Sequence, residues 1–314
     1  MAASDLTPRN RVAVVGSGAL GLFYGAMLQR AGQDLHFLLR RDLQAITAAG
    51  LQVRSIDGDF HLPEVAGYAD TREIGVVDLV LVGLKTFANP ALVDLVAPLV
   101  GPSTAILTLQ NGLGNEELLA EAFGVDAVLG GIAFLCANRG APGTVLHLGE
   151  GRIRLGEAGG GLSARARELA GLFSQAGVPC DAVADLQRAR WEKLVWNIPF
   201  NGLCALTGKD VTELLAHPPS ARLVKDIMDE VVAGANRQNL NAPLDGARLI
   251  ANMLAMTRQM DHYRPSMMLD RLEGRPLELE AIYAIPLQRA KTRGASLPKV
   301  EMLHALLELG ELGS

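Results

Sequence analysis

The feature that most constrains the fold is the glycine-rich segment GSGALG at residues 16–21. The β-branched run Arg11–Val15 precedes it and contains no turn residues, which is typical of a buried parallel strand. A helix of small residues is expected from the glycines to Ala31, with Gly32 as its C′ residue. A second apolar strand is predicted at Leu35–Leu39. Strand, turn, helix and strand within about thirty residues predict one βαβ unit.

The same alternation continues along the N-terminal half of the chain. Further strands are predicted at Leu79–Leu84 and Thr104–Gln110. The pair Asn89 and Pro90 is expected to cap the helix between them, and Asn115 to begin the next helix. Strands that alternate with helices predict an α/β fold with a parallel, doubly wound sheet of the Rossmann type.

The pattern changes in the second half of the chain. From about Asp126, short apolar runs separated by Gly and Pro turns predict antiparallel additions to the same sheet. Beyond residue 185 strand signals almost vanish, and Ser220 and Asp245 are candidate N-caps of long helices. We therefore predict an α/β domain at residues 1–185 and an all-helical domain at residues 186–314.

Composition excludes several classes of protein. Apolar residues make up 49% of the 314 residues and charged residues 20%, which excludes overall disorder. A net charge of −5 gives no basic footprint for nucleic acid, and the apolar runs are too interrupted to span a membrane. Residues 1–10 lack the apolar core of a secretory signal. The three cysteines have no zinc spacing, so we expect a reduced, cytoplasmic enzyme without a metal site: Cys136, Cys180 and Cys204.

The glycine turn predicts a dinucleotide site. Gly16, Gly18 and Gly21 permit a tight turn, a close approach of backbone to pyrophosphate, and close packing of helix on strand. The N-terminus of the following helix offers free N–H groups and a partial positive charge to a phosphate. The alternative is a tight turn with a purely structural role. The residues expected to bind the cofactor are Gly16, Ser17, Gly18, Ala19, Leu20 and Gly21.

The end of the second strand indicates which dinucleotide binds. An NAD site usually has Asp or Glu there, about 20 residues after the glycines, to bind the ribose 2′-hydroxyl. This strand ends in FLLRRD, which places Arg40 and Arg41 at that position. A guanidinium pairs well with a 2′-phosphate, so NADP(H) is the predicted cofactor and Arg40 the preferred contact. Two alternatives stay open: both arginines are surface cations, or Asp42 binds a ribose hydroxyl and the cofactor is NAD.

Two polar residues follow successive strands of the predicted sheet. Lys85 follows one buried strand, and Asn111 follows the next, before a glycine. In open α/β sheets the carboxyl ends of the strands face the ligand crevice, so both are expected at the cofactor site. Individually, the lysine would ordinarily be solvated and the Asn-Gly pair a simple turn.

A polar stripe runs along an otherwise apolar helix predicted at Trp191–Gly208. Lys193, Asn197 and Asn201 recur at intervals of four, and four residues advance a helix by about 400°, so the three share one face. Burying such groups without partners would cost roughly 1–3 kcal/mol each. The stripe therefore predicts a small polar ligand, unless it faces solvent. The aromatic residues of this helix are interpreted as packing: Trp191, Trp196 and Phe200.

Taken together in their order and spacing, the matching segments resemble ketopantoate reductase, also called 2-dehydropantoate 2-reductase, over essentially the whole chain. These segments are GSGALG, FLLR, LVGLKTF, LTLQNGLG, WEKLVWNIPFNGLCALTG and RPSMMLDRLEGRPLELEAI. The resemblance implies an NADP-binding Rossmann domain joined to a helical domain like that of 6-phosphogluconate dehydrogenase. It also implies that the substrate lies in the cleft between the domains.

The same resemblance implies catalytic and cofactor-side residues. Lys193 matches the catalytic lysine and Glu278 the acidic residue near it. Lys85 and Asn111 match residues on the cofactor side of the crevice.

The substrate-binding positions match less completely. Asn197 and Asn201 match amides that contact substrate, and Ser266 matches the serine that binds the substrate carboxylate. Tyr263 stands where some members have a substrate-binding Asn, and Pro265 where a second Ser is common. We expect Tyr263 and Ser266, three residues apart, to share one face of a helix. Tyr263 would either contact substrate in place of that Asn, which we favour, or narrow the pocket against a branched substrate.

The implied activity is hydride transfer from NADPH to the keto carbon of ketopantoate, giving pantoate for pantothenate biosynthesis, with Lys193 as proton donor. One alternative is an NADP-dependent reductase of another small 2-oxo or 3-hydroxy acid on the same scaffold. Another is a non-catalytic NADP-binding regulator. Apolar helix faces in the second domain would permit a homodimer.

Overall fold

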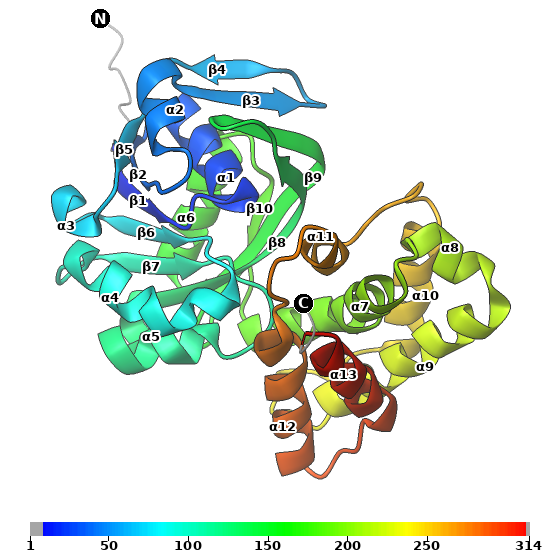
Figure 1. Ribbon diagram of the computed structural model, residues 1–314. Coiled ribbons are helices and arrows are strands. Elements are labelled where there is room, and N and C mark those ends of the chain that lie inside the picture. Colours follow the sequence, from blue (N-terminus) through cyan, green and yellow to red (C-terminus); the bar gives the residue numbers. More distant parts are fainter. Residues whose placement is uncertain (1–8, 312–314) are drawn as a thin grey trace, which may run out of the picture. The chain divides into compact units, whose positions relative to one another are not determined.

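The computed structural model describes residues 9–311, and the chain separates into two compact units. The first unit comprises Met1–Gln110 and Asn115–Leu186, and the second comprises Asn111–Gly114 and Gln187–Ser314 (Figure 1). The short segment Asn111–Gly114 thus belongs by its contacts to the helical unit. Most of the N-terminal segment considered above for a secretory signal lies outside the described residues.

The first unit is built on one ten-stranded mixed sheet with the order β4-β3-β9-β8-β7-β6-β1-β2-β5, in which β10 pairs with β9. The pairs β3–β4 and β8–β9 are antiparallel and the others are parallel. The strands are β1 (Arg11–Val15), β2 (Asp34–Leu38), β3 (Leu51–Ser55), β4 (Phe60–Leu62), β5 (Ala66–Tyr68), β6 (Leu79–Val82), β7 (Ala105–Thr108), β8 (Val128–Arg139), β9 (Thr144–Glu157) and β10 (Cys180–Ala182).

The predicted βαβ unit is confirmed. β1 has the predicted bounds, helix α1 covers Ala19–Arg30, and Gly32 follows the helix with φ +93°. β2 begins and ends one residue before its prediction and lies parallel to β1. The antiparallel additions are also confirmed, but their strands are long rather than short: β8 has 12 residues and β9 has 14, with register shifts between them.

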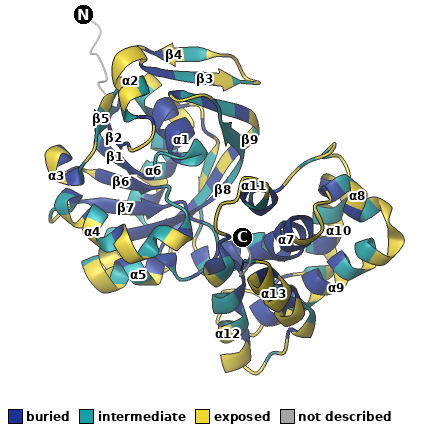
Figure 2. Cartoon of the chain, viewed as in Figure 1, coloured by how far each residue is buried: buried dark blue, intermediate teal, exposed yellow. Residues whose placement is uncertain are grey.

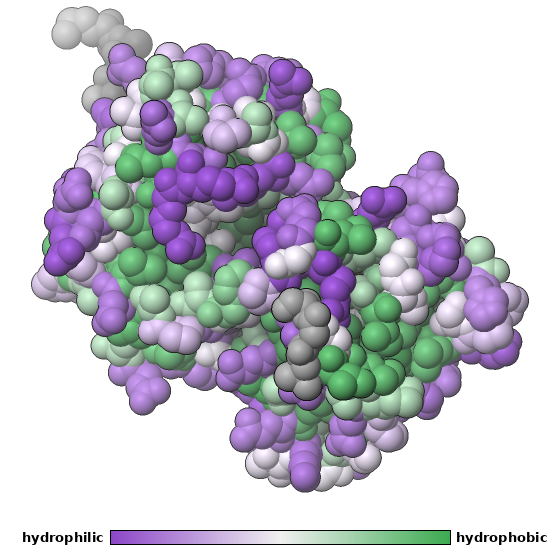
Figure 3. Space-filling model, viewed as in Figure 1, coloured by the Kyte–Doolittle hydropathy of each residue, from purple (hydrophilic) through white to green (hydrophobic). Residues whose placement is uncertain are grey.

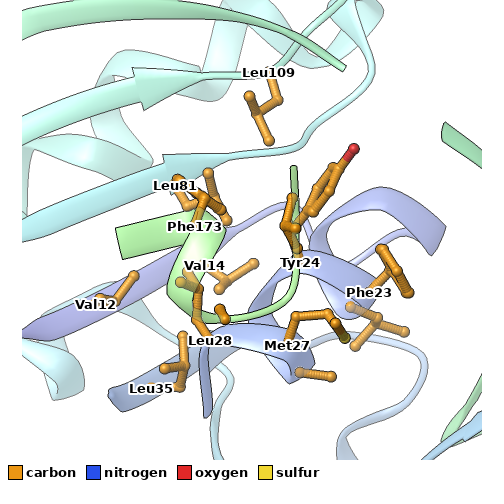
Figure 4. Close-up of a cluster of buried hydrophobic side chains, with 14 of the residues drawn as sticks. Val12, Val14, Phe23, Tyr24, Met27, Leu28, Leu35, Leu81, Leu109 and Phe173 are labelled. Atoms are coloured by element: carbon orange, nitrogen blue, oxygen red, sulfur yellow. The ribbon is translucent and has the colours of Figure 1, made fainter. Parts of the chain in front are cut away.

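Alternate residues of the central strands point into two different cores. Val12 and Val14 of β1 pack in one cluster, together with α1 and Phe173 of α6 (Ala164–Gln175) (Figure 4). Ala13 and Val15 pack in the other, against helices on the opposite face. Both faces of the sheet are therefore covered, which explains why its strands are continuous apolar runs. The helices of the second face are α3 (Thr71–Ile74), α4 (Leu92–Val96) and α5 (Asn115–Phe123).

Within residues 187–311 the second unit contains helices and connecting loops but no strand. Its central helix is α7, and Figure 2 shows that most of α7 is buried. Together with the Rossmann-type first unit, this confirms the predicted fold class. The helices are α7 (Leu186–Thr207), α8 (Val211–Ala216), α9 (Pro218–Ala235), α10 (Gly246–Thr257), α11 (Ser266–Leu272), the π-helix η4 (Glu280–Ala284), α12 (Ile285–Thr292) and α13 (Pro298–Glu311).

Two of the predicted helix starts are wrong. Asn89 and Pro90 lie inside a 3-10 helix, η1 (Thr86–Ala91), and α4 begins only at Leu92. His217, not Ser220, is the N-cap of α9, because two prolines start that helix. The third predicted cap is confirmed, since the Asp245 carboxylate accepts from the N–H of Arg248.

Two kinds of feature are absent from residues 9–311. No helix in this range is long and apolar enough to cross a membrane. Within the same range, no three His, Cys, Asp or Glu side chains are grouped closely enough to hold a metal ion.

Candidate active site

The glycine turn is formed by close backbone packing. A Cβ on Gly16, which has φ +103°, would lie 2.3 Å from the backbone nitrogen of Leu84. A Cβ on Gly21 would lie 2.2 Å from the carbonyl oxygen of Gly16. Both positions therefore require glycine. The Ser17 hydroxyl donates to the carbonyl of Leu38 at 2.7 Å and ties the turn to the end of β2.

Gly18 differs from the other two glycines of the turn. It is the N-cap of α1, it makes no side-chain cap, and a Cβ there would meet no atom within 4 Å. Ala19 and Leu20 follow in the first helical turn, which contains no acidic residue. Open space in front of free helix N–H groups is what a dinucleotide pyrophosphate requires, so these residues fit the predicted cofactor.

The three consecutive charged residues that follow β2 differ in burial. Arg40 and Arg41 are exposed, whereas Asp42 is only 3% exposed. The Asp42 carboxylate accepts a hydrogen bond from the guanidinium of Arg139, at the end of β8. The alternative in which Asp42 binds a ribose hydroxyl thus loses support, because that carboxylate is committed within the fold. Figure 3 shows a hydrophilic band on the visible face of this unit, over the region of α1 and α2 (Leu43–Ala49).

Lys85 and Asn111 follow neighbouring parallel strands, as predicted. The last residues of β6 and β7, Val82 and Thr108, are paired in register, and each polar residue comes three positions later. Lys85 is the half-buried N-cap of η1 in the first unit. Asn111, however, belongs to the second unit, where its Oδ1 accepts a hydrogen bond from Lys193 Nζ at 2.7 Å. The structure therefore joins Asn111 directly to the predicted catalytic lysine.

A hydrogen-bond network of three amides around the exit of β7, of which Gln110 and Asn115 are buried and Asn89 is half-buried, was missed by sequence reasoning. Gln110 donates to Asn89 at 2.8 Å, and Asn89 donates to Asn115 at 3.1 Å. The Thr108 hydroxyl donates to Gln110 Oε1 at 3.0 Å. This network fixes the strand exit immediately before Asn111. The repeated amides of QNGLGN were the signal, but Asn111 and Asn115 were interpreted singly, as a cofactor-side residue and a helix start.

The segment Asn111–Gly114 packs against the π-helix η4. The N–H of Leu113 donates to the carbonyl of Ala281 at 2.9 Å. Gly112 has φ +80°, and a Cβ there would lie 2.3 Å from the same carbonyl oxygen. π-helical turns are rare and are frequently found at functional sites. Here η4 holds the segment that carries the hydrogen-bond partner of Lys193.

Helix α7 carries the predicted polar stripe into a largely apolar environment. Asn197 is 4% exposed and Asn201 is 2% exposed, which excludes the solvent-facing alternative for these two amides. Asn201 Oδ1 accepts from the N–H of Met267 at 3.4 Å. Within residues 9–311, the Asn197 side chain forms no hydrogen bond. Asn197 is also not among the residues in this range whose polar side-chain atoms are sealed from solvent without a partner, so its amide is free to bind a ligand.

Between Asn197 and Asn201 the backbone hydrogen bonding of α7 is interrupted. Pro199 lies inside α7 and removes one backbone donor, so the ladder is interrupted there. The buried Tyr283 of η4 donates its hydroxyl to the carbonyl of Ile198 at 2.9 Å. A Cβ on Gly202 would lie 2.4 Å from that hydroxyl oxygen, so glycine is needed for the approach. Burial raises the pKa of Tyr283, which therefore stays protonated and serves as a donor.

Ser266 and Tyr263 do not share a helix face, so that expectation is wrong. α11 begins at Ser266 with Pro265 as its N-cap, and Tyr263 lies in the preceding loop. A proline disfavours helical geometry at the residue before it, which explains why α11 does not begin before Pro265. Ser266 is half-buried and directly precedes Met267, whose N–H donates to Asn201. The Tyr263 ring lies 6.2 Å from that of Trp196, centroid to centroid.

The first turn of α8 holds the loop that carries Tyr263. The N–H of Val211 donates to the Tyr263 carbonyl at 3.2 Å, and the His262 N–H donates to Thr212 Oγ1 at 3.0 Å. His262 Nδ1 also lies 2.7 Å from Asp210 Oδ2. This hydrogen bond to Asp210, reinforced by its charge, raises the pKa of His262.

Glu278 lies in the turn that leads into η4. It is 4% exposed, and its carbonyl accepts from the N–H of Ile282 at 3.2 Å. Lys193 and Glu278 are thus both connected to η4, the former through the Asn111 segment and the latter through the chain itself. Of the aromatic residues on α7, Trp191 and Phe200 are fully buried, as the packing interpretation predicts. Trp196 stacks on Phe200 at 4.9 Å and donates to Thr257 at 2.9 Å.

Comparison with known proteins supports the resemblance along nearly the whole chain. The family described as ketopantoate reductase PanE/ApbA matches residues 12–160, and its C-terminal counterpart matches residues 185–311. A 2-dehydropantoate 2-reductase from Nostoc sp. is 42% identical over 95% of this chain and 94% of that protein.

Solved structures agree with these matches. A structure of 2-dehydropantoate 2-reductase from Geobacter metallireducens GS-15 has a TM-score of 0.94 and is 58% identical, covering 96% of this chain and 99% of that one. D-mandelate dehydrogenase with NADH and anilino(oxo)acetate shares the fold, with a TM-score of 0.88 at 23% identity over 96% of this chain and 98% of that one. The family's description names the reduction of a keto acid, ketopantoate. On its matched domains and its fold, this chain belongs to the ketopantoate reductase family of oxidoreductases.

Proposed function

We propose that this protein reduces ketopantoate to pantoate with NADPH. The observation that carries the proposal is the arrangement along α7, where Lys193 Nζ contacts Asn111 and the Asn197 side chain makes no hydrogen bond within residues 9–311. A cation beside an amide that is free to bind a ligand suits an acid that also contains a carbonyl group. The names of close relatives point to the same substrate.

The cofactor half of the proposal rests on the first unit. The glycine turn and the first turn of α1 would hold the pyrophosphate, and Arg40 would pair with a 2′-phosphate. Lys85 is proposed as a further cofactor contact. Asp42 is buried in an ion pair, which favours NADPH over NADH. When bound, NADPH supplies the hydride for the keto carbon of the substrate.

The chain's own residues supply the proton and the positioning. Lys193 holds a proton at Nζ for the carbonyl oxygen, which becomes an alkoxide as the carbonyl is reduced. Asn111 Oδ1 accepts from the same Nζ and so orients it. Glu278 is proposed as the acidic residue that helps to keep this amine protonated. One NADPH, one proton and one keto acid give one NADP⁺ and one hydroxy acid.

Substrate positioning is proposed for the remaining residues. Asn197, Asn201 and Ser266 would bind the hydroxyl and carboxylate oxygens of the acid and hold its carbonyl for attack. Tyr263 is proposed to line the same site with its hydroxyl as a donor.

A second candidate is an NADP-dependent reductase or dehydrogenase of a different small 2-oxo or 3-hydroxy acid. The aromatic pair of Tyr263 and Trp196 favours it, because a ring is bulkier than the amide found in some relatives and would alter the fit to a branched substrate. A non-catalytic NADP-binding regulator is the third alternative, and the Lys193–Asn111 contact argues against it.

One turnover assay separates the three. Purified protein is mixed with NADPH and ketopantoate, then with NADPH and unbranched 2-oxo acids, and finally with NADP⁺ and 3-hydroxy acids, while absorbance of the nicotinamide is followed. We expect the highest kcat/KM with ketopantoate. A higher kcat/KM with another acid would replace the substrate, and NADPH binding without turnover would leave only the regulator.

Two further predictions concern the protein in the cell. The homodimer remains a prediction; α13 exposes Met302, Leu306 and Leu309, and light scattering after size-exclusion chromatography would measure the state. Cytoplasmic localisation also remains a prediction, which cell fractionation would test.

A further inference from the structure

The connection from β2 to α2 carries two exposed positive charges and one buried negative charge. Arg40 and Arg41 are exposed, whereas the next residue, Asp42, has a side chain only 4% exposed. The partner of Asp42 is Arg139, 97 residues later in the chain, whose side chain is 30% exposed. An acid thus sits beside the two arginines and is turned into the fold.

The partner of this acid is held in place by the sheet. Arg139 is the last residue of β8, and the turn after it packs on α2 and β3. A Cβ on Gly143 would lie 3.4 Å from the carbonyl oxygen of Gly50 and 3.6 Å from Ala45 Cβ. The N–H of Gln52 donates to the Gly143 carbonyl at 2.9 Å. The position of the Arg139 backbone is therefore fixed relative to α2, the helix that Asp42 precedes.

The location of this acid matters for cofactor choice. A carboxylate near the end of the second strand of a dinucleotide fold binds the ribose 2′-hydroxyl and repels a 2′-phosphate. The sequence of this chain supplies such a carboxylate at Asp42, next to the arginines proposed to bind that phosphate.

We propose that Arg139 is a positioning residue that sets the preference for NADPH. Its ion pair keeps the Asp42 carboxylate inside the fold, so the end of β2 presents guanidinium groups to the cofactor. Arg139 acts through Asp42 and need not touch the cofactor. The inference rests on the proposed use of NADPH.

The consequence of losing Arg139 follows from electrostatics. A buried carboxylate without its partner is unfavourable, so Asp42 would turn toward water. It would then lie beside Arg40 and Arg41, neutralise one of them, and add negative charge where the 2′-phosphate binds. NADH has no 2′-phosphate, so its binding would not suffer, and the carboxylate would be available to its ribose hydroxyl.

The test compares the two cofactors in Arg139→Gln and in a matched control. Kd is measured for NADPH and NADH by quenching of protein fluorescence. We expect NADPH affinity to fall at least about tenfold in Arg139→Gln, the scale of one charge-assisted interaction, while NADH affinity is unchanged or improved. The control is Arg165→Gln: Arg165 has a side chain 35% exposed and pairs with Glu157, whose side chain is 11% exposed, in the same unit. It removes the partner of a carboxylate of similar burial and should leave the preference unchanged.

A second variant separates electrostatics from damage to the fold. Adding Asp42→Asn to Arg139→Gln removes the carboxylate, and NADPH preference should return. Equal losses for both cofactors in Arg139→Gln, or no recovery in the double variant, would overturn the inference. If Arg139→Gln does not fold, the double variant still decides, because loss of NADPH preference in it contradicts the proposal. A wild type that binds NADH as well as NADPH would instead refute the proposed use of NADPH, and this inference with it.

Discussion

The proposed ligand sites of the two units are built from different parts of the chain. In the first unit the site is mainly backbone: Gly16 and Gly21 bring chain segments into contact, and Gly18 leaves space in front of helix N–H groups. In the second unit the site is made of side chains on one buried helix, α7, oriented by segments distant in sequence. Substitutions at the glycine turn of the first unit should therefore change the affinity for the cofactor. Substitutions on α7 should change the catalytic rate or the binding of the acid substrate.

The largest effect is expected on α7. Lys193→Ala should lower kcat by about 10²-fold or more, the usual scale for a lost general acid. NADPH affinity should change little, because the proposed phosphate contacts lie in the first unit. Steady-state kinetics and a direct NADPH titration would measure both. Lys209→Ala, which breaks only an exposed ion pair with Glu213, serves as control. Near-normal turnover in the Lys193 variant would remove this residue from the mechanism.

The next effect belongs to the first unit. Arg40→Ala should weaken NADPH binding by about 10- to 150-fold, equivalent to roughly 1.5–3 kcal/mol for a charge-assisted contact, and leave NADH nearly unaffected. Kd for each cofactor is the measurement. Equal losses for both would mean that Arg40 holds structure, and Arg41 would be tested next.

The glycines of the turn allow a sharper division within the first unit. Gly18→Ala should weaken NADPH binding while the melting temperature changes little, because the new Cβ meets no protein atom within 4 Å. Gly21→Ala should instead lower stability by about 1–3 kcal/mol, the typical cost of overpacking, because its Cβ would clash with Gly16. Thermal unfolding with and without NADPH distinguishes the two. Similar stability losses in both variants would contradict the open space assigned to Gly18.

The smallest effect concerns the loop that carries Tyr263. The pKa of His262 is raised by its hydrogen bond to Asp210 and by the nearby charges of Asp210, Asp261 and Glu213, the last of which also pairs with Lys209. A raised folded-state pKa means that the stabilisation is fully present below the unfolded value of about 6.5 and is lost as pH rises through the folded value.

The melting temperature of wild type should therefore exceed that of His262→Gln by most near pH 5.5. This difference should shrink toward pH 9, and because the His262 side chain is largely exposed it should be small throughout. A difference that grows with pH would show that the ion pair does not hold this loop.

A structural feature could be predicted from the sequence when the residues that determine it are close together in the chain, and could not when they are far apart. β1 was predicted to the residue because a fully buried parallel strand is a continuous apolar run. Asn89 was misassigned because its amide bonds to Gln110 and Asn115, partners that helix-cap rules do not include. The burial of Asp42 was equally hidden, since its partner lies 97 residues away.

The candidate site shows the same limit. Spacing alone placed Lys193, Asn197 and Asn201 on one helix face, but the contact between Lys193 and Asn111 depends on how the chain returns to α7. The loop position of Tyr263 was predictable, since Pro265 disfavours helix at the residue before it, but the three-residue spacing to Ser266 was followed instead.

The proposed roles of the two units, acid binding on α7 and cofactor binding at the glycine turn, are tested most directly at Asn197, a residue of α7 whose side chain makes no hydrogen bond within the described chain. Asn197→Ala and Gly18→Ala are compared by NADPH Kd and by KM for ketopantoate at saturating NADPH. We expect Asn197→Ala to raise KM by about tenfold, the scale of one strong hydrogen bond, with NADPH Kd unchanged, and Gly18→Ala to raise the NADPH Kd. An Asn197 variant that loses NADPH affinity but keeps its KM would contradict the account.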